Sequence, residues 1–123
     1  MAVTKSIVSE RLYTTVALDT TANLSLDLFN DANTTLYAME VTNPNSAGVY
    51  IRVLWTNTLS GKTTSTQYDN CHYIPAESAL SIYCGTGYLI SSGIVIWCST
   101  ETGVNSLSAP ARPVSIKIAY KNT

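Results

Sequence analysis

Charged side chains are scarce in this chain of 123 residues: they make up 12% of it, and the formal net charge is -1. The sequence has no basic run of the kind that neutralises a series of phosphates, which argues against nucleic-acid binding. A surface with few charges is also poorly suited to keeping free copies of a protein apart. We therefore expect a protein that works inside an assembly.

Long apolar runs are also missing. No stretch approaches the roughly 20 apolar residues that a helix needs to cross a bilayer. Near the start, Lys5 is followed by only Ile7 and Val8, which is too little for the hydrophobic region of a secretion signal. We expect a product made in the cytoplasm, with no membrane partner.

Cysteine and histidine are too few and too widely spaced to indicate a disulfide framework or a metal site. The three cysteines, Cys71, Cys84 and Cys98, are an odd number at wide intervals, which is typical of reduced thiols. Together with His72 they lack the paired short spacings that preorganise zinc ligands. We predict no metal ligands.

Catalytic chemistry has little to build on, because His72 is the only histidine. Asp69 lies three residues before it, but no GxSxG nucleophile motif is present, so we read His72 as a histidine at a strand edge.

Calcium would need clustered oxygen ligands, and residues 27–33 come nearest, although a simple Asx turn explains them. The glycines at 85 and 87 do not open a helix and are read as turn residues, not as a phosphate-binding loop. We predict no catalytic residues, no cofactor and no enzymatic activity.

The centre of the pattern is the stretch of residues 36–55. Alternating apolar residues before and after a turn-rich break at 43–48 predict two strands, which we interpret as a central hairpin. The break contains Pro44 and Gly48, which disfavour a continuous strand.

Further strands follow the same period of two along the rest of the chain. Alternation predicts them near residues 12–18, 24–28, 71–74, 80–84, 88–90, 94–99 and 114–121. The run IVIWCS at 94–99 is apolar throughout and is expected in the middle of a sheet. No segment shows a sustained helical period, and these short runs amount to about eight strands. We therefore predict an all-β antiparallel sandwich, an eight-stranded jelly roll. Residues 1–10 are expected to be an N-terminal arm and 11–123 a single sandwich domain.

Polar loops and tyrosines are the candidates for contacts with partners. The loop at residues 56–70 is long and has little to bury, which is typical of a functional loop. Four tyrosines, Tyr68, Tyr73, Tyr83 and Tyr88, fall near loops and strand ends. Tyrosine serves both sugar-binding faces and subunit interfaces, so a carbohydrate platform and an interface both remain open.

The order of segments from residue 36 to 121 resembles small virion proteins of tailed bacteriophages, of the capsid decoration or head-fibre type. The segments are LYAMEVTNPN, VYIRVLW, IPAESALSI, GTGYLISSGIVI and VSIKIAYK, with polar loops between them. The longer loop at 56–70 and the three cysteines depart from the simplest members of that group. Because loops decide the docking partner, these departures leave the position on the particle open.

The resemblance implies a jelly-roll-like domain that sits on a virion, commonly as a homotrimer, and performs no catalysis. It carries no ligand or catalytic residue over to this chain. Our leading hypothesis is therefore a capsid decoration or cement protein that stabilises the assembled head by contacting the major capsid protein or another virion structural protein. The alternative is a carbohydrate-binding or host-attachment module in a head fibre or tail.

Overall fold

The computed structural model describes residues 3–9, 14–101 and 107–122, and over these residues it consists of nine strands without a helix. The strands are β1 (Val3–Ser9), β2 (Thr14–Ala22), β3 (Asp27–Asn30), β4 (Thr34–Asn43), β5 (Val49–Leu54), β6 (Asn70–Ile74), β7 (Ser78–Ile90), β8 (Ile94–Ser99) and β9 (Val114–Asn122). The start of the strand predicted at 12–18 and part of the polar loop predicted after residue 99 lie outside the described residues. The all-β prediction is confirmed.

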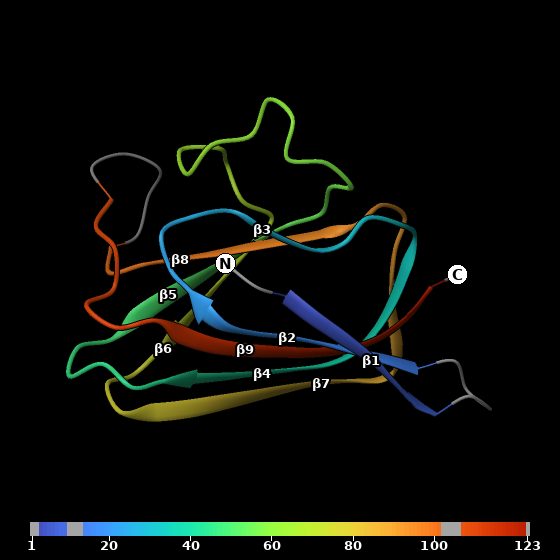
Figure 1. The fold of residues 1–123 in the computed structure, drawn as a ribbon, viewed down its shortest axis with the longest axis horizontal. Helices are drawn as coiled ribbons and strands as arrows, with labels where there is room; N and C mark the ends of the chain where they lie inside the picture. Colours follow the sequence, from blue (N-terminus) through green and yellow to red (C-terminus); the bar gives the residue numbers. More distant parts are fainter. Residues whose placement is uncertain (1–2, 10–13, 102–106, 123) are drawn as a thin grey trace.

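The strands form two antiparallel sheets that stack as a sandwich (Figure 1). One sheet has the order β1-β2-β9-β4-β7 and the other the order β3-β8-β5-β6. The pairs β2–β9, β3–β8, β4–β7 and β5–β6 are nested in the sequence. The chain is thus one long hairpin, and the connection of residues 55–69 is its turn. The hairpin is wrapped so that successive strand pairs belong alternately to one sheet and to the other. This wrapping is the predicted jelly roll, to which β1 adds a ninth strand.

The core lies between the two sheets because each strand turns alternate residues inward. Its fully buried members include Phe29, Ile51, Ile96, Ile116 and Tyr120. All six residues of β8 are buried, and β8 lies between β3 and β5, as its continuous apolar run predicted. Period-two alternation therefore accounts for most of the core.

The predicted central hairpin is wrong, because β4 and β5 belong to different sheets and do not pair. The physical reason lies in the connection between them. The Asn43 side-chain amide donates hydrogen bonds to the carbonyls of Ala47, Ile74 and Pro75 at 3.0, 3.2 and 3.1 Å. These bonds tie the end of β4 to the segment that follows β6, and the chain crosses from one sheet to the other.

The two strands predicted at 80–84 and 88–90 form one strand, β7, of thirteen residues. The predicted turn at residues 85–87 is instead an irregularity within this strand, where the register against β4 shifts between Tyr83 and Tyr88. Gly85 and Gly87 have positive φ angles of 60° and 121°, a backbone conformation that glycine adopts easily. The glycines therefore form a bulge and do not end the strand.

The strand predicted at 24–28 begins later, at Asp27. Its inward residues are Asp27 and Phe29, at 1% and 0% exposure, whereas Leu28 is only partly buried. In the sequence Leu24, Leu26 and Leu28 alternate with Ser25 and Asp27, which predicts that Asp27 lies on a polar face. The strand instead turns this carboxyl into the interior. The aspartate was thus assigned to the wrong side of the sheet.

The N-terminal strand β1 pairs with β2 and forms one edge of its sheet. In Figure 1 it crosses in front of the other strands. The sequence predicts no strand here, because residues 3–9 show no clear alternation. The predicted division into an arm at 1–10 and a domain at 11–123 stays a prediction.

Candidate functional site

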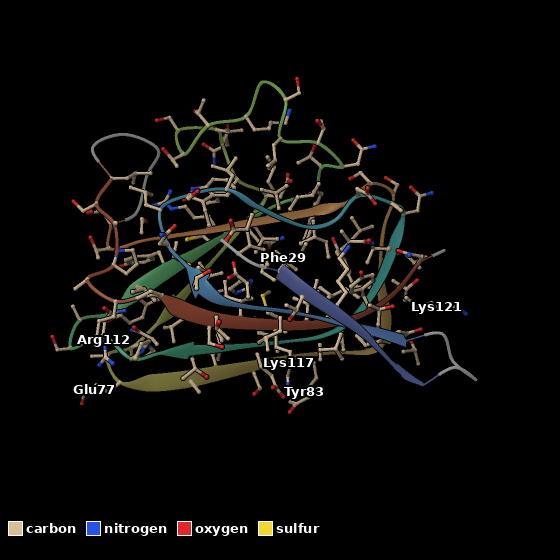
Figure 2. All side chains as sticks on the ribbon, viewed as in Figure 1. Phe29, Glu77, Tyr83, Arg112, Lys117 and Lys121 are labelled. Atoms are coloured by element: carbon tan, nitrogen blue, oxygen red, sulfur yellow. The ribbon has the colours of Figure 1, made fainter. Side chains whose placement is uncertain are left out.

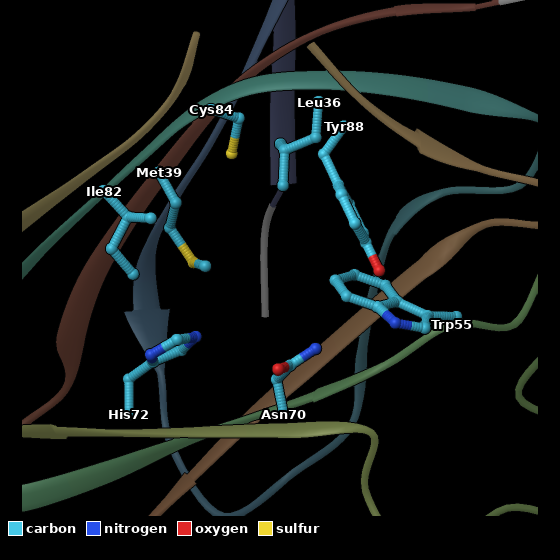
Figure 3. Close-up of a pocket in the computed structure, with 8 residues that line it drawn as sticks. All are labelled: Leu36, Met39, Trp55, Asn70, His72, Ile82, Cys84 and Tyr88. Carbon is cyan, nitrogen blue, oxygen red and sulfur yellow. The ribbon is translucent and has the colours of Figure 1, made fainter.

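A pocket of about 240 Å³ opens between the two sheets, where the edge strands β6 and β7 lie on the same side of the sandwich. Side chains from β4, β6, β7 and the residue after β5 line it (Figure 3). They are Leu36, Met39, Trp55, Asn70, His72, Ile82, Cys84 and Tyr88. The pocket exists because the two edges belong to different sheets and none of the described strands closes the gap between them.

Two aromatic rings form one wall of this pocket. The ring centroids of Trp55 and Tyr88 are 5.9 Å apart with an angle of 47° between the ring planes. Tyr88 is half exposed, at 50%, so the rim of the pocket is open to solvent. Figure 3 shows the two rings side by side, opposite the sulfur-bearing side chains of Met39 and Cys84. This wall can stack against a flat apolar surface.

The polar groups of the pocket are uncharged near neutral pH. Burial lowers the pKa of His72 below its ordinary value, which favours the neutral imidazole. Burial raises the pKa of the Cys84 thiol, which disfavours the thiolate. Asn70 adds an amide with both donor and acceptor groups. The arrangement therefore suits a neutral ligand that offers one flat face and a few hydroxyl or amide groups.

The residues considered for catalysis do not assemble into a site. Asp69 accepts a hydrogen bond from the Trp55 backbone N–H at 2.8 Å, which closes the long loop at its base. His72 lies on the edge strand β6, opposite Ile51, as the sequence suggested. Asp69 thus has a structural partner of its own.

The residues considered for zinc lie in separate places. Cys71 and His72 are neighbours on β6 and point to opposite faces of the sheet, whereas Cys98 is fully buried in the core. Cys84 faces the pocket. All three cysteines are free thiols, as predicted. Among the described residues, no three His, Cys, Asp or Glu side chains gather in a way that would hold a metal ion.

The residues considered for calcium are also dispersed. Asp27 points into the core and Asp31 is exposed. Asn30 donates hydrogen bonds from its amide to Thr34 Oγ1 at 2.7 Å and to Asn122 Oδ1 at 2.9 Å. An amide that donates in this way organises the chain and leaves no shared ligand set at residues 27–33.

The four tyrosines do not form a common platform. Tyr73 packs on Tyr50 at a centroid distance of 5.1 Å, and the guanidinium of Arg52 lies 5.1 Å from the ring centroid of Tyr68. Tyr83 stands on the outer face of the other sheet, at 74% exposure. Only Tyr88 reaches the pocket. The aromatic partner that sequence reasoning missed is Trp55, whose position just before the long polar loop was the available signal.

A second group that sequence reasoning missed is a pair of buried carboxyls. Asp19 on β2 and Asp27 on β3 are 0% and 1% exposed and face each other between the sheets. Burial, followed by the neighbouring Asp19, raises the pKa of Asp27 from 3.8 to about 8. The signal was the position of Asp27 two residues before Phe29, because residues two apart share a face of a strand.

Comparisons with known proteins add little to this geometry. No protein-family model and no curated protein matches the chain. Among solved structures, the coat protein of tobacco streak virus is similar, with a TM-score of 0.41, 11% sequence identity, and coverage of 95% of this chain and 91% of that chain. Over the described residues, no helix has the length and apolar character needed to cross a membrane.

Proposed function

We propose that this protein is a structural component of a virion, specifically a capsid decoration or cement protein of a tailed bacteriophage. The observation that carries the proposal is the jelly-roll order of its strands, an architecture used by viral capsid domains. The phage-like segments coincide with the strands of this architecture: LYAMEVTNPN contains most of β4, VYIRVLW contains β5, and VSIKIAYK contains most of β9. This agreement supports the resemblance as one of fold.

The proposed mechanism is stabilisation by mass action. A protein that binds only the assembled shell lowers the free energy of that state in proportion to the logarithm of its occupancy. The partner would be the major capsid protein or another virion structural protein, with other copies of this chain beside it. The role requires no catalysis.

The ordered polar loop at residues 55–69 supplies a suitable surface for such contacts. Its hydroxyl groups organise the loop from within: Thr66 Oγ1 accepts from the Thr63 N–H at 2.8 Å, and Thr58 Oγ1 accepts from the Ser60 N–H at 3.0 Å. A loop that is already ordered loses less conformational entropy when it binds. Leu59, at 41% exposure, gives this surface an apolar contact point.

The proposal is tested by locating the protein in purified particles and counting its copies. A copy number comparable to that of the capsid subunits, together with earlier thermal disruption of heads that lack the protein, is the expected result. A few copies at the neck or tail, or absence from the particle, would contradict the cement role.

A second candidate is a carbohydrate-binding or host-attachment module, and the pocket beside Trp55 and Tyr88 specifically favours it. Jelly rolls also serve as lectin domains, and an aromatic wall with neutral polar groups suits a sugar ring. A glycan array distinguishes the two roles. Binding to particular glycans that Tyr88→Ala abolishes, while the matched control Tyr73→Ala outside the pocket preserves it, would support attachment. Uniformly negative arrays would remove this candidate.

A further inference from the structure

We propose that two copies of this chain pair edge to edge through β7, in antiparallel fashion about a two-fold axis, so that the sheet β1-β2-β9-β4-β7 continues into its counterpart. β7 is the last strand of that sheet and pairs only with β4 among the described strands. Its other edge presents backbone donors and acceptors, which are a template for a further strand.

The four edges of the two sheets differ in how they are protected. Natural sheets avoid pairing through short edge strands, charged side chains, proline or β-bulges. β3 has four residues, β6 has five and is followed by Pro75, and β1 carries the exposed Lys5. β7 has thirteen residues, SALSIYCGTGYLI, with neither a charge nor a proline. Its bulge lies after Tyr83, so residues 78–83 are an edge segment without these protective devices.

Apolar exposure gathers on the same strand. Among the described residues, the exposed large hydrophobic side chains are Leu59, Tyr73, Tyr83, Tyr88 and Leu89, and three of these five belong to β7. Leu89 is 76% exposed and Tyr83 is 74% exposed. Figure 2 shows Tyr83 projecting at the edge of the molecule that β7 forms. An edge that combines exposed apolar side chains with unpaired backbone groups is more favourably covered by a partner strand than by solvent.

The absence of charge on β7 fits a second copy of this chain as the partner. In a two-fold contact each residue lies near its own counterpart, so any charge close to the axis would face the same charge. β7 is uncharged along its whole length and therefore meets this condition. A partner selected by charge would instead require a charged strand here.

The regular part of β7 defines the register. Residues Ser78 to Tyr83 follow β4 without interruption, and the bulge after Tyr83 ends the regular edge. Directly opposite residues of an antiparallel pair share a face. With Ser81 on the axis, Ala79 of one copy lies opposite Tyr83 of the other. The large ring then covers a small side chain, and Ser81 lies opposite its own counterpart.

On the outer face, the neighbours of Tyr83 across the sheet are small. Tyr83 is paired with Ala38 on β4, Ala38 with Ala119 on β9, and Ala119 with Val16 on β2. This row of small side chains leaves Tyr83 standing above the sheet. A second copy of β7 would supply the missing cross-strand neighbour on its other side.

The first experiment measures the mass of the full chain in solution by sedimentation, with charges placed at the proposed axis. We expect the wild type to form a two-fold dimer, and Ser81→Lys and Ser81→Glu each to raise its dissociation constant at least tenfold. An equimolar mixture of the two variants should recover the dimer, because opposite charges then meet. Thr4→Lys, at the exposed edge of β1, is the matched control and should leave the mass unchanged.

A monomeric wild type, a three-fold oligomer, or a dimer that both Ser81 variants leave intact would overturn the pairing. The circular dichroism and melting curve of each variant show that it is folded. The equimolar mixture of the two Ser81 variants also excludes a folding defect, because misfolded variants would not form a dimer with each other.

The second experiment tests the register by crosslinking, in a Cys71→Ser, Cys84→Ser background in which the remaining Cys98 is fully buried. Two cysteines on the axis have their Cα atoms within disulfide range. Ser81→Cys should therefore give a covalent dimer under mild oxidation. Thr42→Cys lies on the same face one strand inward, paired with Ala79, and should not crosslink. Absence of the Ser81 crosslink would overturn this register.

The pairing does not depend on a virion role, since neither experiment involves a particle.

Discussion

Asp27 on β3 and Asp19 on β2 bring two carboxyl groups together across the interior of the sandwich, where both residues are at most 1% exposed. Thr21 donates to Asp19 Oδ1 from its N–H at 2.9 Å and from its hydroxyl at 3.0 Å. Apart from each other, the oxygens of Asp27 and Asp19 Oδ2 find no hydrogen-bond partner among the described residues. A proton on Asp27 compensates for this, because two adjacent buried anions would repel each other.

The first prediction concerns the dependence of stability on pH. The pKa of Asp27 rises from 3.8 to about 8, mainly through burial, so the folded state keeps a proton that the unfolded state has already lost. The contribution of this proton to the free energy of unfolding is fully present below pH 3.8. It is lost as the pH rises towards 8, at up to about 1.4 kcal/mol per pH unit. Urea unfolding at pH 5, 7 and 9 should show this decline.

The substitution Asp27→Asn should remove most of this decline, because the amide stays neutral and can donate to Asp19. Its matched control is Asp31→Asn at an exposed carboxyl, which should leave the slope unchanged. Equal slopes for the wild type and Asp27→Asn would show that Asp27 does not carry the proton.

The second prediction concerns the crossing from β4 to β5. Asn43 is 1% exposed, donates to three backbone carbonyls and accepts from the Asn45 N–H at 3.0 Å. Asn43→Asp keeps the shape but replaces the donor with an acceptor that faces three carbonyl oxygens. We expect a loss of at least about 3 kcal/mol in the free energy of unfolding. Asn57→Asp in the exposed loop is the control, and a similar loss there would refute the role of Asn43.

Period-two alternation predicted the sandwich, most strands and the central position of β8, because inward residues of a buried sheet must be apolar. It failed at the connections. The hairpin at 36–55 was wrong since the side-chain bonds of Asn43 send the chain to the other sheet, and a pattern of hydrophobicity does not record such bonds. The pocket was missed because Trp55, His72 and Tyr88 come from three separate segments. Only the nesting of strand pairs brings them together.

The third prediction concerns Arg52, which is fully buried on the side of β5 that faces away from the core. Its Nε–H donates to Ser99 Oγ at 2.9 Å, its guanidinium also bonds the Glu101 carbonyl, and Tyr68 from the long loop lies against it. Arg52→Met should therefore cost about 2–4 kcal/mol and loosen the loop. Chemical denaturation and proteolysis within residues 55–69 measure the two effects.

The control for Arg52 is Arg112→Met, because the Arg112 side chain is exposed. We expect it to change the unfolding free energy by less than about 0.5 kcal/mol. If both methionine variants unfold at the same denaturant concentration as the wild type, Arg52 does not anchor the loop.

The fourth prediction concerns the bulge in β7. Gly87 has a φ of 121°, and a Cβ added there would lie 2.3 Å from Thr35 Cγ2 on the neighbouring strand. Gly87→Ala should cost about 2–4 kcal/mol, because backbone strain and overlap add. Gly61→Ala is the matched control, since Gly61 has a φ of 71° with nothing within 4 Å of the added Cβ. It should lose only about 1–2 kcal/mol, from backbone strain alone. Thermal unfolding of the two variants separates the cost of backbone strain from the cost of overlap with Thr35. Equal losses of stability in both variants would mean that the contact with Thr35 does not require glycine at position 87.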